Sequence, residues 1–485
     1  MVNNNSLKSA ATKGMLWSAV EKILLRFGQF AIHIILARLL LPKDFGLIGM
    51  LTIFIALSQI FVDSGMESGL IQKQKRTDRD FSTVLIFNFG ISVLFYFILF
   101  LLAPFIAEFY SKPELTMLTR VLGLNVIINS LAVVQRTIFK IELDFKTLAK
   151  VNVLSIIVSG VIAILSAYYG AGVWALVIQN LVQATITTIM FWGFSKWRLS
   201  IHFSRDSFKH LFGFGSKLLL AGLYSKSLQE VYNVVIGKFY NASELGFYYN
   251  GKKLTEVLTG IVSSVIQQVS YPILASVQDD KKRMISIYSQ TLRMTAFLII
   301  PSMTLLALLA DPLIRLLLTD EWLPVIVLLQ WLSFATMFRP ISVINMNILN
   351  AIGRSDLFLK TDLSKLPFIV IALIITVPIG LEAIVIGSLI TSLISFFINA
   401  YMPGKLFDYG AIKQLKEMIP VFLATGFMAL FVYLGTLWIN SNIIKIMAGS
   451  ILGIFTYLLL CHIFKIQELK EIHNIVHNFR NKRKD

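Results

Sequence analysis

The chain has 485 residues, of which 56% are hydrophobic and 15% are charged, and its mean hydropathy is +0.74. A soluble protein of this length would carry nearer a quarter charged residues, so the composition excludes an ordinary soluble enzyme and indicates a polytopic membrane protein. The formal net charge of +17 would suggest a nucleic-acid partner in a soluble chain. In a membrane protein, basic residues retained in cytoplasmic loops explain it instead, and we expect no nucleic-acid partner.

The N-terminal stretch and the cysteine content exclude some kinds of processing and chemistry. Residues 1–13 are polar and lack the basic, apolar and small-residue succession of a cleaved signal peptide, so we expect the first apolar segment to remain in the mature protein. Cys461 is the single cysteine, which excludes an intramolecular disulfide and a multi-cysteine metal or iron–sulfur site. We expect neither a metal nor a cofactor.

Apolar segments long enough to cross a membrane follow one another along the chain. A helix that crosses about 30 Å of hydrocarbon needs roughly 20 apolar residues. We expect about fourteen such helices, with approximate bounds 14–40, 45–71, 81–109, 115–138, 148–169, 173–195, 208–238, 243–275, 284–310, 323–352, 357–378, 382–403, 415–438 and 443–464. No loop between them exceeds roughly 15 residues, which leaves no room for a soluble catalytic domain. The sequence therefore predicts an all-α polytopic membrane protein that is not an enzyme.

Basic residues are distributed unequally between alternate loops, which predicts the orientation of the chain. Short loops rich in Lys and Arg stay in the cytoplasm. With the N-terminus inside, about 28 Lys and Arg residues lie in inner segments, about 6 in outer loops and about 10 within the spans. We therefore expect both termini in the cytoplasm, which requires an even number of spans.

Three pairs of segments suggest that the helices form two copies of one unit. ARLLLPKDFG (37–46) aligns with GKFYNASELG (237–246), LAPFIAEFYSKPEL (102–115) with LADPLIRLLLTDEWL (309–323), and residues 150–170 with 360–380. The pairs occur in the same order, and transporters are often duplicated bundles. We expect two six-helix lobes, 1–205 and 206–410, related by a pseudo-twofold axis along the membrane normal. An added helix pair, 411–464, and a cytoplasmic tail, 465–485, would follow.

Several short motifs resemble those of a known transporter family. They are GMLWS (14–18), ARLLLPKDFGLIGM (37–50), SGLIQKQ (68–74), YPILASVQDD (271–280) and LIRLLLTDEW (313–322). The chain resembles the polysaccharide or O-antigen flippases of the Wzx type, which belong to the multidrug/oligosaccharidyl-lipid/polysaccharide (MOP) exporter superfamily. These motifs are signatures of packing and loops, so they indicate the family better than the substrate.

The resemblance implies a function, a location and a set of partners. It implies that an undecaprenyl-diphosphate-linked oligosaccharide crosses the bacterial inner membrane through a cavity between two lobes that work by alternating access. Its implied partners are the lipid-linked glycan, membrane lipids, H⁺ or Na⁺ as a coupling ion, and other polysaccharide assembly proteins. Two alternatives stay open. One is a cation or drug exporter of the same superfamily, whose cavity should be acidic, and the other is a membrane glycan polymerase or ligase, which usually has a sizeable outer loop.

Cations within the spans are candidates for substrate binding, because a charge in mid-bilayer is costly unless it faces a wet cavity or a partner. We expect the diphosphate to be held by Arg26, Lys226, Lys252, Lys253 and Lys22, which helical spacing places beside the cavity-lining polar residues Gln29, His33, Gln229 and Asn233. Each cation also has an alternative role. Arg26 can pair with Glu21 and Lys226 with Glu230, while Lys22, Lys252 and Lys253 can extend to lipid headgroups.

Carboxylates within the spans are candidates for ion coupling, because a carboxylate in the cavity can exchange a proton or bind Na⁺. The candidates are Asp63, Glu67, Glu256 and Glu230. The alternative is that each of them only neutralises a neighbouring Lys or Arg. The sequence does not decide between the cavity and the interior of a lobe for five further charged residues, which are Arg120, Arg293, Arg339, Asp362 and Lys365.

The C-terminal tail repeats apolar residues at helical spacing and ends in the basic sequence RNKRKD. The apolar positions are Ile466, Leu469, Ile472, Val476 and Phe479. This pattern is typical of a basic amphipathic helix that lies on the anionic inner leaflet. A partner-binding segment or a disordered end is the alternative.

Overall fold

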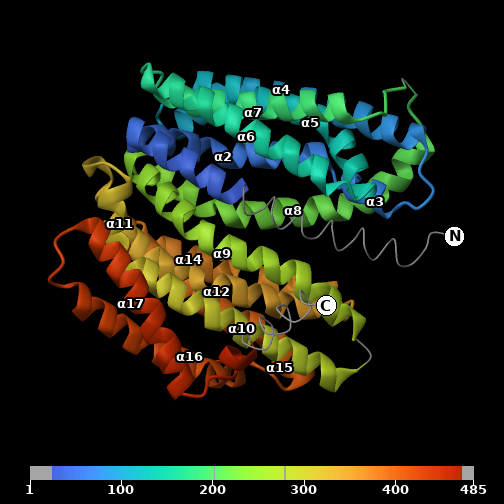
Figure 1. The fold of residues 1–485 in the computed structure, drawn as a ribbon. Helices are drawn as coiled ribbons and strands as arrows, with labels where there is room; N and C mark the ends of the chain where they lie inside the picture. Colours follow the sequence, from blue (N-terminus) through green and yellow to red (C-terminus); the bar gives the residue numbers. More distant parts are fainter. Residues whose placement is uncertain (1–24, 201, 278–279, 472–485) are drawn as a thin grey trace, which may run out of the picture. The chain divides into compact units, whose positions relative to one another are not determined.

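The computed structural model describes residues 25–200, 202–277 and 280–471, and within them all regular secondary structure is helical (Figure 1). A helix over residues 25–39 comes first. It is followed by α2 (Pro42–Asp63), α3 (Met66–Gln72), α4 (Asp78–Phe109), α5 (Leu115–Ile141), α6 (Phe145–Tyr168), α7 (Val173–Phe194), α8 (Arg205–Phe239), α9 (Ala242–Ser276), α10 (Lys281–Leu308), α11 (Ala310–Leu317), the short 3₁₀ helix η1 (Asp320–Trp322), α12 (Val325–Ala351), α13 (Ser355–Leu363), α14 (Leu366–Thr376), α15 (Leu381–Phe407), α16 (Ala411–Thr436) and α17 (Asn442–Ile463).

Ten helical segments of the described residues are long and apolar enough to cross a membrane, so the chain is a multi-pass membrane protein. α2 and α3 count together as one of them, Pro42–Gln72. The other four expected spans fall on residues 25–39, on α8, on α9 and on the α13–α14 pair. α8 and α9 have 35 residues each, and the charged side chains within them lower their hydropathy. The expected total of about fourteen spans stays a prediction.

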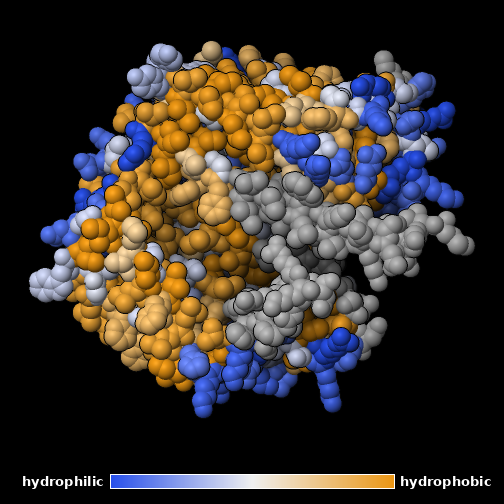
Figure 2. Space-filling model, viewed as in Figure 1, coloured by the Kyte–Doolittle hydropathy of each residue, from blue (hydrophilic) through white to orange (hydrophobic). Residues whose placement is uncertain are grey.

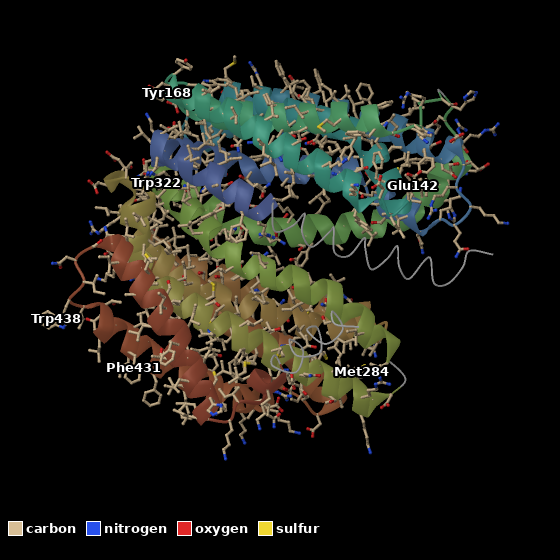
Figure 3. The ribbon with its side chains drawn as sticks, in the orientation of Figure 1. Glu142, Tyr168, Met284, Trp322, Phe431 and Trp438 are labelled. Atoms are coloured by element: carbon tan, nitrogen blue, oxygen red, sulfur yellow. The ribbon has the colours of Figure 1, made fainter. Side chains whose placement is uncertain are left out.

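The surface separates apolar flanks from polar helix ends, as a bilayer requires. In the face that Figure 2 shows, hydrophobic residues cover the sides of the helices and hydrophilic residues gather around their ends. Figure 3 labels Tyr168 at one end of α6 and Glu142 at the turn before its other end. Trp438, between α16 and α17, is 90% exposed. Exposed aromatic side chains at helix ends are typical of the interface between hydrocarbon and water.

The helices form two compact units, Met1–Tyr249 and Asn250–Asp485, which we call the N-terminal and C-terminal units. The N-terminal unit therefore includes α8 and the first turns of α9. This division follows internal packing and does not test the expected lobes 1–205 and 206–410, which stay a prediction.

A break between α2 and α3 allows α8 to pack closely in the N-terminal unit. Ser64 and Gly65 both adopt the left-handed conformation, with φ of 44° and 67°. A Cβ on Gly65 would lie 2.5 Å from the carbonyl oxygen of Gly215 in α8, and a Cβ on Gly215 would lie 2.3 Å from that of Ser64. Because two glycines meet there, the backbones of α3 and α8 come into direct contact.

A second close contact joins the two aligned motifs of the sequence. A Cβ on Gly46 in α2 would lie 1.7 Å from the carbonyl oxygen of Ala242, and a Cβ on Gly246 in α9 would lie 1.9 Å from that of Pro42. Gly46 and Gly246 occupy the same position of the two motifs, as do Pro42 and Ala242. The contact is thus reciprocal, and neither glycine position has room for a side chain.

In the C-terminal unit, α10, α12, α15, α16 and α17 surround one large apolar core. Leu292, Phe396 and Cys461 are fully buried within it. The core also contains a closed polar cluster. The hydroxyl of Tyr288 donates to Asn345 and accepts from Gln414 Nε2 at 3.0 Å. The Asn345 amide donates to Gln414 Oε1 at 3.2 Å. These bonds tie α16 of the expected added helix pair to α10 and α12.

Candidate functional site

The first helix carries part of the predicted cationic face. Arg26 and His33 are half-buried and Gln29 is exposed. Lys22 lies outside the described residues, as does Glu21, the alternative partner of Arg26. The two roles expected for Arg26, diphosphate binding and a pair with Glu21, therefore both stay predictions.

On α8, the predicted cation lies in an ion pair. Lys226 Nζ is 2.7 Å from a carboxylate oxygen of Glu230, one helical turn further on. Glu230 is 5% exposed and also accepts a hydrogen bond from the Asn233 amide at 2.6 Å. Gln229 is exposed and donates to Ser225 at 3.3 Å. The pairing that we weighed as the alternative role of Lys226 is therefore present.

A similar cluster lies on α9 and α12 of the C-terminal unit. Glu256 is 3.7 Å from Lys253 Nζ and 3.9 Å from the guanidinium of Arg339. Lys252, which precedes Lys253 in the sequence, is half-buried. Arg339, which the sequence left unassigned, thus joins two residues that were singled out as candidates.

The predicted carboxylates of α2 and α3 differ in their partners. Asp63 accepts a hydrogen bond from Gln59 at 3.3 Å. Glu67, on α3, binds two cations of α5: it lies 3.2 Å from Arg136 and forms a second ion pair with Lys140. Within the described part of the chain, Asp63 is the one candidate carboxylate without an ion pair.

The two α5 cations, Arg136 and Lys140, were missed by the sequence analysis. Arg136 stands at the end of the expected span 115–138, and Lys140 was assigned to the following inner loop. The helix in fact continues to Ile141, so the two cations are one turn apart on one face. Their spacing of four residues was the signal that could have identified them.

These clusters share one arrangement, in which a carboxylate on an apolar helix is neutralised by one or two half-exposed cations. An anionic phosphate that approached would compete with the carboxylate for the cation. A proton or Na⁺ would compete with the cation for the carboxylate. If an anionic substrate took the cation while a proton or Na⁺ took the carboxylate, both charges of the pair would stay compensated.

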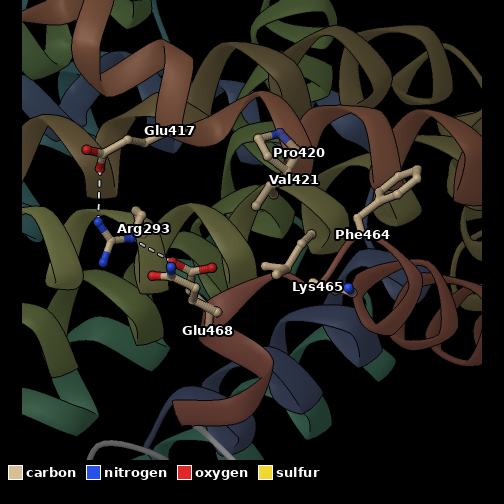
Figure 4. A pocket seen from close by; sticks show the side chains of 9 residues that line it. Arg293, Glu417, Pro420, Val421, Phe464, Lys465 and Glu468 are labelled. Carbon is tan, nitrogen blue, oxygen red and sulfur yellow. Dashed lines mark hydrogen bonds and ion pairs between the residues drawn. The ribbon is translucent and has the colours of Figure 1, made fainter.

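Arg293 belongs to a different site, where the C-terminal segment meets α10 and α16 (Figure 4). Its guanidinium lies 3.1 Å from Glu417 and 2.7 Å from Glu468. Glu417 also accepts a hydrogen bond from the hydroxyl of Tyr409 at 2.5 Å. A pocket of about 370 Å³ lies beside this group and is also lined by Lys465.

The remaining unassigned charges have local partners. Asp362 and Lys365 form an ion pair of 2.6 Å at the junction of α13 and α14. The guanidinium of Arg120 lies over the ring of Phe100 of α4, 4.2 Å from its centroid. Cation–π contacts of this kind stabilise an arginine beside an apolar surface. For the tail, the expected amphipathic helix falls mostly on residues 472–485, outside the described residues.

Together, the apolar helices and their internal charges define an all-helical multi-pass membrane protein with the fold of known transporters. The chain is similar to the lipid II flippase MurJ in an inward closed conformation, with a TM-score of 0.76 and 17% identity over 93% of this chain and 98% of that one. It is also similar to an inward-facing multidrug resistance MATE family transporter of the MOP superfamily, with a TM-score of 0.62 and 15% identity over 80% of this chain and 96% of that one.

The family follows from the sequence comparisons. A model of the family described as polysaccharide biosynthesis protein matches residues 35–327, more than half of the chain, so the chain belongs to that family. The teichuronic acid biosynthesis protein TuaB of Bacillus subtilis (strain 168) is 23% identical over 88% of this chain and 89% of its own. The lipopolysaccharide biosynthesis protein WzxC of Escherichia coli (strain K12) is 22% identical over 86% of each. These matches confirm the predicted relation to the Wzx-type proteins of polysaccharide biosynthesis.

Proposed function

We propose that this protein moves an undecaprenyl-diphosphate-linked oligosaccharide across the bacterial inner membrane by alternating access, coupled to an ion gradient. Its family and its full-length relatives in teichuronic acid and lipopolysaccharide biosynthesis support a role in moving a glycan precursor. The observation that carries the proposal is the set of cations on these helices that are paired with carboxylates. A lipid diphosphate is a ligand that such cations attract.

In this proposal the diphosphate is bound by Arg26, Lys226, Lys252 and Lys253, and Lys22, outside the described residues, is a further candidate. Lys226 would leave Glu230 for the phosphate when substrate enters. Arg136 and Lys140 join the candidates, because they are shared with Glu67 in the same manner. Gln29, His33, Gln229 and Asn233 would line the path as hydrogen-bond partners of the sugar or phosphate.

Asp63 is our first candidate for ion coupling. Glu67, Glu230 and Glu256 are each neutralised by a cation in the described structure, so a proton or Na⁺ would first have to displace that cation. Asp63 has an amide partner, Gln59, which leaves its negative charge for an ion. Glu67, Glu230 and Glu256 would take part later in the cycle, after substrate has drawn their cations away.

We further propose about fourteen spans, two lobes related by a pseudo-twofold axis along the membrane normal, and both termini in the cytoplasm. The reciprocal contact of Gly46 with Ala242 and of Gly246 with Pro42 supports the axis. Equivalent positions of two repeats meet in this way when a twofold axis passes between them. The excess of basic residues in the inner loops supports the orientation.

The test is transfer of a labelled undecaprenyl-diphosphate-linked oligosaccharide in proteoliposomes, with and without a proton or Na⁺ gradient. We expect gradient-dependent transfer by the wild type, and a loss of at least about tenfold, or about 1.4 kcal/mol, for Arg26→Ala combined with Lys226→Ala. Asp63→Asn should abolish the gradient dependence at unchanged expression. Lys416→Ala, which removes an exposed lysine of α16, is the control. Unimpaired transfer by the double variant would refute the binding role.

A second candidate function is export of cationic drugs, which the fold shared with a multidrug resistance MATE family transporter supports. The sign of the substrate separates the two functions, because a cationic drug would need the carboxylates and a diphosphate would need the cations. Drug efflux that survives Lys226→Ala but not Glu230→Gln would favour the exporter. A glycan polymerase or ligase has less support, since the two structures that share this fold are named as a flippase and a transporter.

A further inference from the structure

A cavity of about 460 Å³ lies between α13 and α15 of the C-terminal unit, apart from the charged clusters above. Its volume falls within the roughly 300–1,000 Å³ range of small-molecule sites. Its lining is mainly apolar and includes Phe397, Ile398 and Met402 of α15. A smaller polar group, Lys360, Thr361 and Ser364 of α13, forms the other wall.

Thr361, which lines this cavity, has a buried hydroxyl whose hydrogen bonding is not satisfied within the part of the chain that the structure describes. Thr361 is 4% exposed, and its hydroxyl has no hydrogen-bond partner among the described residues. A buried hydroxyl without a partner costs about 1–3 kcal/mol, so such groups are retained where something else satisfies them. Ser364 beside it is already engaged, because its hydroxyl donates to the carbonyl of Thr361 at 2.8 Å.

One lysine lines the crevice, and a second lies beyond its lining residues on α15. Lys360 lines the cavity, and Lys405 lies one helical turn beyond Tyr401 on the same face of α15. Both lysines are exposed, and neither takes part in an ion pair within the described residues. α13 begins and α15 ends on the same side of the unit, because α14 and α15 are consecutive packed helices that run in opposite directions.

The surroundings of the crevice are apolar and exposed. Leu359 and Leu363 of α13 are 46% and 41% exposed, and Phe397 and Tyr401 of α15 are 49% and 63% exposed. α15 is one of the helices suited to span the membrane. Exposed leucine and phenylalanine on such a helix face lipid chains, and an exposed tyrosine near its end suits the headgroup level.

We propose that this crevice binds one anionic phospholipid, such as phosphatidylglycerol, with an acyl chain in the apolar cavity and the phosphate between Lys360 and Lys405. The hydroxyl of Thr361, which is inaccessible in the described structure, turns into the crevice on binding and donates to an ester or phosphate oxygen of the same lipid. Basic pockets between transmembrane helices on the cytoplasmic side recognise anionic headgroups in this way. The lipid belongs to the inner leaflet, an assignment that rests on the proposed orientation of the chain.

A lipid fits the crevice better than a soluble anion, because free phosphate gains nothing from Phe397, Ile398 and Met402. The lipid phosphate also supplies a negative charge opposite Lys360, which has no ion pair with a carboxylate of the described residues. Asp356, one turn before Lys360, is already bound to Arg354 at 2.8 Å, and Asp362 is bound to Lys365. The nearby negative charges of α13 are therefore engaged elsewhere.

The test uses the full-length protein reconstituted with phosphatidylglycerol that carries a photoactivatable group in its acyl chain. After irradiation, mass spectrometry should find adducts concentrated on peptides that contain residues 360–364 and 397–402. Lys360→Ala combined with Lys405→Ala should lower these adducts at least threefold. Lys416→Ala should leave them unchanged. Equal labelling by a phosphatidylcholine probe, or no effect of the double variant, would overturn the anionic site.

Thr361→Val provides a second measurement that does not depend on the lysines. In detergent alone, the variant should be as stable as the wild type or more stable, because it removes an unsatisfied buried hydroxyl of nearly the same size. Added phosphatidylglycerol should raise the Tm of the wild type more than that of the variant. An equal rise for both would remove Thr361 from the site.

A competitor distinguishes this lipid from the transported one. Unlabelled phosphatidylglycerol should displace the probe, and a lipid-linked oligosaccharide at the same concentration should not. Displacement by the oligosaccharide would assign the crevice to the substrate and refute the proposal. Because these measurements follow binding and not transfer, they can succeed or fail independently of the proposed flippase activity.

Discussion

The ion pairs of α8 and the ion pairs of Arg293 are chemically alike but differ in how they are held. Lys226 is held by one carboxylate of its own helix, whereas Arg293 binds carboxylates from two other segments, Glu417 and Glu468. Glu417 is fixed in turn by Tyr409, which stands beside the closed cluster of Tyr288 and its partners. A cation with one local partner can change partners, and a cation with two distant partners joins helices together. We therefore expect function from the first arrangement and stability from the second.

The largest effect should follow from Arg293→Ala. It would leave Glu468, whose side chain is 5% exposed, without its cation, and breaking a buried ion pair costs about 3–5 kcal/mol. We expect a clear loss of Tm in detergent, with transport lowered only in proportion to the folded protein. Lys413→Ala, which breaks an exposed pair with Asp408, is the control. A stable variant with no transport would place Arg293 in the substrate path, and the expected difference between the Lys226 and Arg293 ion pairs would be wrong.

The next effect concerns Lys226 and is expected in transport, not stability. Lys226→Ala combined with Glu230→Gln removes both charges of the pair, so unfolding should change by less than about 1 kcal/mol. If Lys226 binds the diphosphate, the double variant should still transfer substrate at least about tenfold more slowly than the wild type. Restoration of wild-type transfer by Glu230→Gln on top of Lys226→Ala would show that Lys226 only neutralises Glu230.

Tyr288→Phe should have a smaller effect, confined to stability. It removes a hydroxyl that serves both Asn345 and Gln414, and an unsatisfied buried amide costs about 1–3 kcal/mol. Thermal unfolding should show this loss while the transfer rate per folded molecule stays at the wild-type value. Tyr433→Phe, at an exposed position of α16, should change neither quantity.

The smallest effect should come from Asp356. The hydrogen bond from Arg354 lowers the pKa of the Asp356 carboxyl from 3.8 to about 2. Because the folded pKa lies below the unfolded one, the contribution is complete above about pH 4 and is lost as the pH falls through about 2. Any difference in Tm between wild type and Asp356→Asn at pH 7 should therefore shrink as the pH falls from about 4 and vanish below about 2. A difference that persists there would contradict the assignment.

The sequence predicted the helices of this protein better than their interactions. Ten of the expected spans coincide with apolar helices, because length and hydropathy are local properties of a chain. The expected span 357–378 proved to be two helices, α13 and α14, since hydropathy does not register a turn between apolar residues. The helix before the turn, α13, carries Lys360 and Thr361, which line the crevice.

Interactions within one helix were predictable and those between helices were not. The pair Lys226–Glu230 follows from a spacing of four residues, which places two side chains on one face. Glu67 with Arg136 and Lys140 joins residues about 70 positions apart, and no periodicity indicates which helices pack together. The same holds for Arg293 and Glu468, which belong to helix α10 and the segment after α17.

The reciprocal contact between the first turns of α2 and α9 also constrains how the cell makes this protein. A ribosome delivers the chain from its N-terminus, and each region can fold only with residues already made. Gly46 packs on Ala242, and Pro42 on Gly246, so the first turn of α2 cannot complete its packing until the start of α9 has been made. Folding of α2 is therefore coupled to a segment made about 200 residues later.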